Sequence, residues 1–423
     1  MGLTGIWASV PHADSYACLE QAKDATQKLV EYCLVNNFEG YDPYDALNSK
    51  IFGSLPILNS RVPRILLTQI MKRSPINLRH LARIPKTQNP KGIALFLSAF
   101  IRLTSIRIAT QGDFVALMIE RLINLRSPGV PYWCWGYSFA WQGRAVLVPR
   151  GAPNLVCTTF VADALLDAYE QNGQTKCLGM AVSAAEYILN ELYWTDGNTA
   201  AAGFSYPLPS IRSQTHNATF LASALLCRLY KQTGDEKFLG PALKAARYSA
   251  AKQSENGSWR YGEAPSQSWI DNFHTGFNLC ALQRIGRYLD NREFEPCIRR
   301  GFSFYRDHFF REDGAARYFH NRTYPIDSHC VAQSIITLIL FRNFDPDNVF
   351  LACSVFQWAM KHMWDDRGFF YYRVLRACTI RTSYMRWTQA WMLLALSVLL
   401  CELSGVVKQP QASPSFTPVE REP

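Results

Sequence analysis

Polar and ionisable side chains recur at the starts of otherwise apolar segments in the second half of the chain. Asp271 precedes His274 by three residues, and Asp327 precedes His329 by two. Histidine titrates near neutral pH and a carboxylate can orient its ring, which suits general acid–base catalysis. Arg386, at the start of a later apolar segment, has a planar guanidinium that can neutralise a carboxylate or a phosphate. These residues predict a site for proton transfer on an anionic substrate.

Two catalytic schemes are compatible with these residues, and the sequence does not choose between them. In a hydrolytic scheme, Asp271 and Asp327 form the carboxylate pair, and their separation decides between retention and inversion. In an epimerase or lyase scheme, Arg386 holds a substrate carboxylate while two groups act on opposite faces of the sugar. The candidates for these groups are His274 or Tyr261 on one face and His329 or Tyr324 on the other.

The same residue types also have structural roles. Asparagine and aspartate at helix starts cap free backbone N–H groups whatever the function, and we favour this role for Asn154, Asn217 and Asn272. Capping does not require histidine or arginine, so His274 and Arg386 are assigned to the site. A metal centre is disfavoured because the histidines lie far apart without local ligand spacing. No nucleotide-binding motif or serine-hydrolase elbow is visible, so we expect no cofactor.

Aromatic side chains indicate the class of ligand. The faces of Trp and Tyr stack on the apolar faces of sugar rings, and their polar atoms reach hydroxyl groups. The same side chains could instead wrap a polyprenyl chain or stabilise carbocations. The candidates for substrate binding, together with Arg386, are His216, Trp259, Trp269, Tyr206, Tyr372, Trp387 and Gln389.

An internal repeat provides the elements that must position these residues. Six apolar segments align on Ala99, Ala164, Ala224, Ala281, Ser334 and Ala390, at steps of 65, 60, 57, 53 and 56 residues. Each full unit continues into a segment with one polar face, which is typical of an inner and an outer helix. We therefore expect an all-α (α/α)6 toroid of six helical hairpins, with the helix around 14–36 closing the ring. The alternative is an open helical solenoid.

Short aromatic loops separate the units. Turns such as Asp196-Gly197, Asn256-Gly257, Asp313-Gly314 and Asp365-Asp-Arg-Gly368 precede aromatic residues, which predicts short β-hairpin loops on one mouth of the toroid. We divide the chain into N-terminal helices and a basic segment packing on the toroid (1–90), the toroid itself (91–407) and a disordered tail (408–423).

The net charge of +10 is concentrated in one stretch. No acidic residue lies between Ala46 and Gly112, whereas eleven basic residues do. This predicts an anionic oligo- or polysaccharide, an acidic membrane surface or a lipid-diphosphate head as the partner of 46–112, and the alternative is a solvated basic face. Nucleic acid is disfavoured because no binding motif accompanies the charge. We expect reversal of Arg79, Arg83 and Lys86 to weaken anion capture and leave folding intact.

The start of the chain and its cysteines suggest a cellular location. Met1–Val10 lacks the features of a secretory signal, and no apolar run reaches the ~20 residues of a membrane helix. Twelve cysteines are scattered without a C-x-x-C pair, which is typical of reduced, buried thiols. We expect a cytoplasmic protein, with a peripheral position at the inner membrane as the second interpretation.

Four strings across the chain resemble a bacterial family found with exopolysaccharide-biosynthesis genes, whose members have often been labelled δ-aminolevulinate dehydratase. The strings are Gly40-Tyr-Asp-Pro-Tyr-Asp-Ala-Leu-Asn-Ser49, Lys72-Arg-Ser-Pro-Ile-Asn-Leu-Arg79, Ser268-Trp-Ile-Asp-Asn-Phe-His-Thr-Gly276 and Tyr384-Met-Arg-Trp-Thr-Gln-Ala-Trp391. A second, local resemblance joins Trp269-Ile-Asp-Asn-Phe-His-Thr-Gly-Phe-Asn278 and Leu282 to a segment of glucuronyl C5-epimerases, which invert uronic acids within a polysaccharide.

These resemblances imply a carbohydrate-active enzyme of exopolysaccharide biosynthesis, of the epimerase, lyase or glycoside hydrolase type. Its substrate would be an anionic glycan, either containing uronic acid or linked to a lipid. The first alternative is a non-catalytic glycan-binding scaffold of the synthesis machinery. The second is an enzyme like the terpenoid cyclases, which would have an almost wholly apolar cavity beneath its rim.

Overall fold

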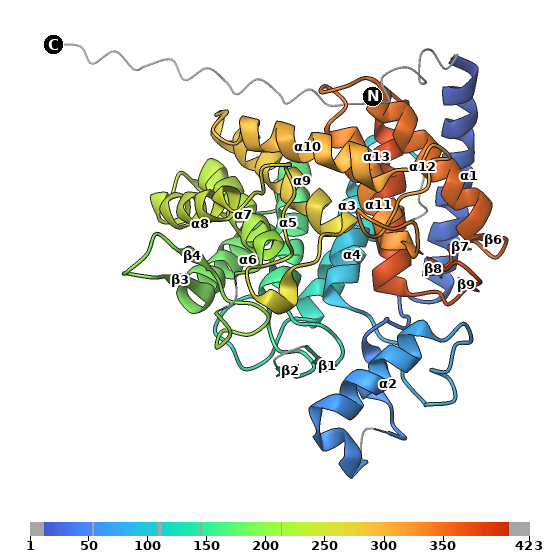
Figure 1. The fold of residues 1–423 in the computed structure, drawn as a ribbon, viewed down its shortest axis with the longest axis horizontal. Helices are drawn as coiled ribbons and strands as arrows, with labels where there is room; N and C mark the ends of the chain where they lie inside the picture. Colours follow the sequence, from blue (N-terminus) through green and yellow to red (C-terminus); the bar gives the residue numbers. More distant parts are fainter. Residues whose placement is uncertain (1–11, 53–54, 109–111, 144–145, 213, 406–423) are drawn as a thin grey trace.

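The computed structural model describes residues 12–52, 55–108, 112–143, 146–212 and 214–405. Helices dominate it (Figure 1). The α-helices are α1 (His12–Val35), α2 (Arg61–Arg73), α3 (Pro90–Ser105), α4 (Phe114–Asn124), α5 (Leu155–Asn172), α6 (Thr175–Tyr187), α7 (His216–Thr233), α8 (Leu239–Ala251), α9 (Asn272–Leu289), α10 (Glu295–Phe309), α11 (Ser328–Leu340), α12 (Asp347–Met363) and α13 (Trp391–Leu403). The 3-10 turns are η1 (Asp45–Asn48), η2 (Pro56–Asn59), η4 (Glu236–Phe238) and η5 (Pro265–Gln267), and the π-helical turns are η3 (Ile188–Leu192) and η6 (Met385–Ala390).

Six helices form a closed inner ring. In chain order α3, α5, α7, α9, α11 and α13 each pack against the next, and α13 packs against α3. The helices α4, α6, α8, α10 and α12 each pack outside the inner helix that precedes them, and α1 packs against α13 and α12 as the sixth outer helix. The predicted (α/α)6 toroid is therefore confirmed, and the contact between α13 and α3 excludes an open solenoid. The outer helix α1 lies before position 90 and the other ring helices begin at or after it, so the toroid includes residues on both sides of the expected boundary at 90.

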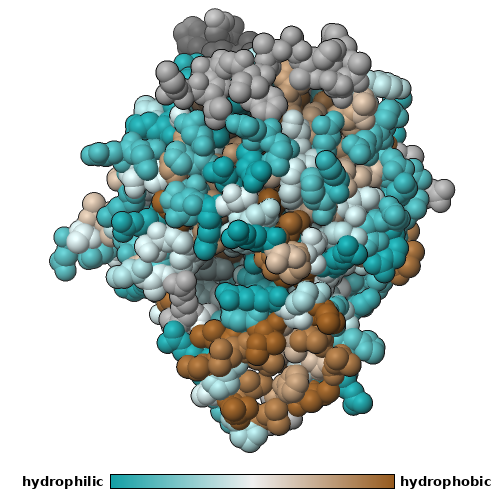
Figure 2. Space-filling view, turned by 45° about the vertical axis from the view of Figure 1, so that its right-hand side comes forward, coloured by the Kyte–Doolittle hydropathy of each residue, from teal (hydrophilic) through white to brown (hydrophobic). Residues whose placement is uncertain are grey.

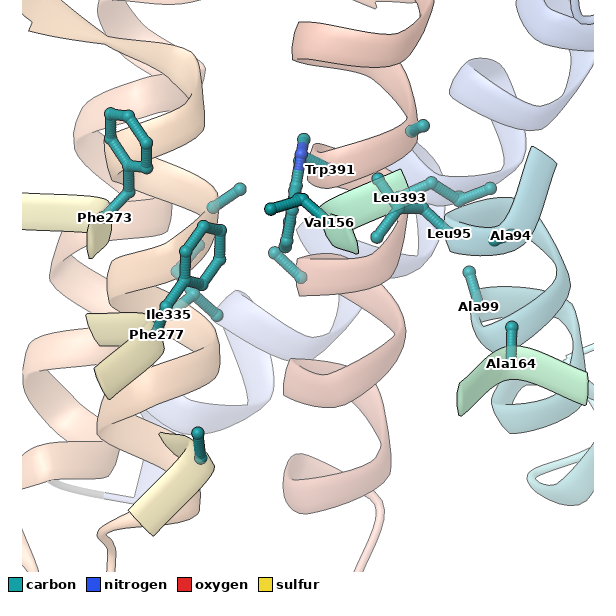
Figure 3. Close-up of a cluster of buried hydrophobic side chains, with 14 of the residues drawn as sticks. Ala94, Leu95, Ala99, Val156, Ala164, Phe273, Phe277, Ile335, Trp391 and Leu393 are labelled. Atoms are coloured by element: carbon teal, nitrogen blue, oxygen red, sulfur yellow. The ribbon is translucent and has the colours of Figure 1, made fainter. Parts of the chain in front are cut away.

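Packing in the ring follows the apolar pattern of the sequence. Helix α11 is buried along almost its whole length, whereas α10 alternates buried and exposed positions, as expected for inner and outer helices. Figure 3 shows a cluster of buried apolar side chains to which α3, α5, α9, α11 and α13 contribute. Among them, the rings of Phe277 and Trp391 lie 5.4 Å apart. This layer of aromatic side chains helps to fill the ring beneath the end where the inner helices begin.

Short strands lie in the loops between hairpins. They are β1 (Trp141–Gln142), β2 (Leu147–Val148), β3 (Tyr193–Thr195), β4 (Ala202–Phe204), β5 (Ile326–Asp327), β6 (Trp364–Asp365), β7 (Phe369–Phe370), β8 (Arg373–Val374) and β9 (Thr379–Ile380). They pair antiparallel as β1–β2, β3–β4, β6–β7 and a β5–β8–β9 sheet. Two of the four predicted hairpins form, at β3–β4 and β6–β7. Asn256-Gly257 and Asp313-Gly314 make turns without a pair of strands among the described residues.

Three of the turn glycines share one packing position. Gly257, Gly314 and Gly368 have φ of +89°, +86° and +89°, and a Cβ there would lie 2.2–2.7 Å from a backbone oxygen of the next outer helix. That helix is α10 for Gly257, α12 for Gly314 and α1 for Gly368. A left-handed turn in close contact with a backbone requires glycine. The contact of Gly368 with α1 gives the N-terminal helix the same position as the other outer helices.

Only part of the basic segment lies in a lobe around α2, which projects from one end of the toroid (Figure 1), because α3 belongs to the inner ring. This α2 lobe, residues 45–84, has its own small core, which includes Met71, Ala82 and Ile84. Arg79 is fully buried in it, where Nε donates to Asp45 Oδ1 at 2.7 Å. The expectation that reversal of Arg79 would leave folding intact is therefore wrong, because the change would bury two acidic groups together. The predicted tail 408–423 lies outside the described residues.

The remaining sequence-based expectations concern cysteines and membrane helices. All twelve cysteines are thiols, and ten of them are buried. No helix in the described ranges combines the length and the apolar character needed to cross a membrane.

Candidate active site

A cavity of about 570 Å³ lies at the end of the toroid where the inner helices begin. This volume falls within the range of roughly 300–1,000 Å³ typical of small-ligand sites. Its lining includes five cationic side chains and many aromatic ones, but no carboxylate among the described residues. The cationic residues are Lys72, Arg73, Lys91, Arg322 and Arg386. An anionic ligand therefore meets only favourable charges in this wall.

His274 and Asp271 form an oriented pair at the start of α9. Asp271 is buried, and its Oδ2 lies 2.7 Å from His274 Nδ1 and accepts a hydrogen bond of 2.9 Å from Trp269 Nε1. The backbone N–H of His274 donates to the other carboxylate oxygen, so Asp271 is also the helix cap. His274 lines the cavity, and its engaged Nδ1 leaves Nε2 for a ligand. The pair has the arrangement of a histidine acid or base held by a carboxylate.

Aromatic rings fix this pair laterally. Tyr261 stacks on Trp269 at 4.4 Å, and the rings of Tyr261 and His274 lie 4.6 Å apart. All three side chains line the cavity. Tyr261, predicted as a catalytic candidate, and Trp269, predicted as a substrate-binding candidate, thus form a compact cluster with His274.

His329 lies deeper in the same cavity. Its ring stacks between Phe273 and Trp391, at 4.5 Å from each, and Trp387 contacts it edge-on at 4.7 Å. Neither ring nitrogen has a hydrogen-bond partner among the described residues. Burial lowers the pKa of His329 well below its ordinary value, and the nearby charge of Lys91 lowers it further. A neutral imidazole without a partner can accept a proton from a ligand.

Lys91 is a functional candidate that the sequence reasoning missed. It lies in the first turn of α3, is 4% exposed and lines the cavity. Its ammonium group lies over the ring of Phe160 at 4.1 Å and forms no ion pair with a described residue. Burial lowers its pKa well below the ordinary value, and the Arg386 charge adds to this effect. The sequence signal that could have identified Lys91 was its position at the start of the first inner helix, because the other site residues occupy the same position in their own helices.

Asp327 does not face the cavity. Its Oδ2 accepts hydrogen bonds of 2.9 and 2.6 Å from Arg373 on β8, and its Oδ1 accepts one of 2.9 Å from Trp387. Its Oδ1 also accepts from the backbone N–H of His329, so Asp327 caps α11. Both carboxylate oxygens are occupied and the residue is buried. The arrangement indicates that Asp327 positions His329 and Trp387, and it does not provide the second carboxylate of a hydrolytic pair.

Arg386 lines the cavity but already has a carboxylate partner. Its Nε and Nη2 donate to the two oxygens of Asp42 at 2.7 and 2.9 Å, and both residues are buried. It belongs to the π-helical turn η6, which presents Arg386 and Trp387 to the cavity. Asp42 thus neutralises Arg386, whereas two other buried cations of the lining, Lys91 and Lys72, form no ion pair with a described residue, and Lys72 donates a hydrogen bond of 2.7 Å to Tyr44 Oη.

The other predicted site residues divide into two groups. Tyr206 and Trp387 line the cavity, and Asn217, expected to be a helix cap, does so too. Asn154 is a cap, as expected, but Asn272 instead hydrogen-bonds with Ser334. The residues found outside the cavity lining are His216, Trp259, Tyr324, Tyr372 and Gln389.

The positions of these outer residues explain their polarity. Gln389 is buried and exchanges hydrogen bonds with both backbone groups of Phe370, which ties η6 to β7. His216 Nδ1 lies 3.3 Å from Ser249 Oγ, and burial lowers its pKa to about 4. Tyr324 is 38% exposed in a surface loop. Gln389 thus supports an element beside the cavity, and sequence spacing cannot separate such support from direct contact.

Comparison with known proteins gives the fold. No family model and no curated protein matches the chain. The solved structures that resemble it include cellobiose 2-epimerase from Spirochaeta thermophila (13% identity, 76% of this chain and 87% of that one, TM-score 0.57). They also include a family 76 α-mannanase from Bacteroides thetaiotaomicron (12%, 86% and 99%, TM-score 0.59) and unsaturated glucuronyl hydrolase from Streptococcus agalactiae (11%, 90% and 91%, TM-score 0.58). At these identities the likeness shows a shared α/α toroid.

Proposed function

We propose that this protein is a carbohydrate-active enzyme that inverts C5 of a uronic acid residue in an anionic glycan. The observation that carries the proposal is the composition of the cavity, which combines two imidazoles with five cations and no carboxylate among the described lining residues. A carbon next to a carboxylate loses its proton more readily when a cation neutralises that carboxylate. The cavity holds both the cations and the bases that this chemistry needs.

In this scheme Lys91 binds the substrate carboxylate. The unpaired ammonium group attracts an anion, and a bound carboxylate favours the protonated form of Lys91 and so opposes the lowering of its pKa. His329, held neutral by its surroundings, takes the proton from C5, and the electron pair is delocalised into the carboxylate beside Lys91. His274, held by Asp271, delivers a proton to the opposite face of C5. The result is inversion without a cofactor.

Competing functions have weaker support from the site. A hydrolytic mechanism needs two carboxylates at the scissile bond, whereas Asp327 is bound to Arg373 and Asp271 lies behind His274. A cyclase-like cavity would be apolar beneath its rim, whereas Lys91 and His329 lie deep in this one. The toroid is shared with proteins named as a sugar epimerase and a glucuronyl hydrolase, which is compatible with this choice. The resemblance to the exopolysaccharide-associated family suggests the biosynthetic context.

Incubation with uronic acid-containing oligosaccharides in deuterated water tests the proposal. We expect deuterium at C5 and a mixture of the two C5 configurations by NMR, lost in His274→Gln and His329→Gln and retained in Tyr324→Phe. Tyr324 is the matched control because it lies outside the cavity lining. Formation of an unsaturated uronate product would contradict epimerisation and show that the enzyme is a lyase, which catalyses elimination. Binding of the glycan without any deuterium exchange would contradict catalysis and support the scaffold function.

A further inference from the structure

The α2 lobe carries most of the exposed apolar surface of the described chain. Eight of the twelve large apolar side chains that are exposed in the described residues lie between positions 51 and 81. Six of these eight are more than half exposed, and we refer to them as the apolar ridge: Ile57, Val62, Leu66, Ile70, Ile76 and Leu81. Scattered exposed apolar residues are ordinary, but a contiguous patch marks an interaction surface. Figure 2 shows this patch as the brown surface over the lower part of the molecule.

The apolar ridge differs from the face of α2 that packs on the core of the lobe. Helix α2 already packs Leu67 and Met71 with the small core of the lobe. Val62, Leu66 and Ile70 are spaced by four residues, so they form a second apolar stripe on the same helix. The helix is therefore apolar on two faces, and the second face has no cover among the described residues.

Exposed basic residues accompany the ridge. Lys50, Arg61 and Arg83 are exposed and form no ion pair with a described residue. No acidic residue occurs between Ala46 and Gly112, and Asp45, immediately before that stretch, is bound to Arg79. The surface thus combines aliphatic side chains with uncompensated positive charge, which complements a partner that offers hydrocarbon beneath negative groups.

We propose that the α2 lobe docks on a bilayer of anionic phospholipids, with the apolar ridge entering the headgroup region. The ridge contains only aliphatic side chains, whereas the cores of protein interfaces favour aromatic residues. Lys72 and Arg73 of α2 also line the cavity, so docking brings the cavity close to the membrane surface. This placement suits a glycan attached to a lipid or lying at the surface. The docking itself is independent of the proposed reaction.

Sedimentation of the full-length protein with vesicles tests this inference. The vesicles contain phosphatidylcholine alone or an equal mixture with phosphatidylglycerol, at physiological ionic strength. Leu66→Glu with Ile70→Glu alters the ridge, and Lys50→Glu with Arg61→Glu alters the charge. The control for the ridge is Val35→Glu, which alters an exposed apolar residue on α1. The control for the charge is Lys176→Glu with Lys244→Glu, which changes the net charge by the same amount as the charge pair but at positions outside the lobe.

We expect the wild-type protein and both controls to bind the anionic vesicles and not the neutral ones. Each basic residue near an anionic surface contributes about a fivefold change in partitioning, so the charge pair should weaken binding at least about 30-fold. The ridge pair should abolish binding while thermal melting stays unchanged, because both positions are exposed. Equal binding to neutral vesicles, or equal loss in the controls, would overturn the proposal. A second result would also overturn the proposal: the wild-type protein does not bind vesicles but forms a concentration-dependent dimer, and the ridge pair dissociates that dimer. The ridge would then be a contact between copies of the protein.

Discussion

Replacement of Lys91 by methionine should make the protein more stable and less active. The buried ammonium has no ion pair with a described residue, and an unpaired buried charge costs several kcal/mol. The rings of Phe160, Trp391 and Phe277 lie 4.1, 5.3 and 5.6 Å from Nζ, and cation–π attraction at about 0.5–1 kcal/mol for each returns about 2 kcal/mol in all. The balance is a cost of about 2 kcal/mol, which an apolar side chain of similar length removes.

The change in melting temperature follows from the size of the protein. An unfolding entropy of about 2.1 cal/mol/K per residue gives about 0.9 kcal/mol/K for 423 residues, so Lys91→Met should raise Tm by about 2 °C at pH 7. Since the pKa of Lys91 is lowered in the folded protein, its cost is present below that pKa and disappears as pH rises toward the unfolded value. The gain should therefore be smaller at pH 10.

Scanning calorimetry at the two pH values measures the stability, and the deuterium-exchange assay measures the activity. Loss of one positioned charge should lower kcat/KM by about 10²–10³-fold. Lys361→Met, at an exposed position on α12, is the matched control and should change neither quantity. A lower Tm at pH 7, or exchange at the wild-type rate, would refute the assignment of Lys91 as an unpaired cation that binds substrate.

Three further predictions concern the buried polar groups. Asp271→Asn should lower kcat by about 10²–10⁴-fold and alter the pH–rate profile, and an unchanged profile would count against the pair. Since the new amide N–H₂ cannot accept from Trp269 Nε1, the variant should also lose about 1–3 kcal/mol of stability. Because the pKa of His216 is lowered to about 4, the unfolding free energy should fall by up to about 3 kcal/mol between pH 6.5 and 4, and denaturant titration should show a flatter decline in His216→Gln. Arg79→Met should lower the unfolding free energy by about 3–5 kcal/mol and make the α2 lobe sensitive to limited proteolysis. The double variant with Asp45→Asn should recover part of this loss. Equal protease resistance of the single variant and the wild-type protein would contradict the buried pair.

The fold was predictable because its signal is repeated along the chain. Each inner helix must be apolar on most sides, and this requirement recurs in every unit, as α11 illustrates. The pairing of Asp271 with His274 was also within reach, because three residues separate them at one helix start. Arg386 and Asp42 are 344 residues apart, so no local pattern could indicate that the guanidinium is already neutralised.

The same limit applies to roles that depend on burial. Asp327 has the spacing of a catalytic carboxylate, but Arg373 reaches it across the pairing of β5 with β8. Arg79 resembles its exposed basic neighbours in sequence and is nonetheless fully buried. In both cases the deciding partner comes from a separate element, and only the folded arrangement identifies it.

The closure of the ring by α1 has a consequence for the order of events during synthesis. Among the described helices α1 is synthesised before the others, whereas the elements that cover its buried face, α12, α13 and the turn at Gly368, follow the rest of the ring. Until then Ala22, Leu29 and Cys33, which are fully buried in the finished ring, have no complete surroundings. Helix α1 must therefore wait for the helices of the last hairpin, so a polypeptide released before α13 is complete would leave α1 uncovered as well as the unfinished side of the ring.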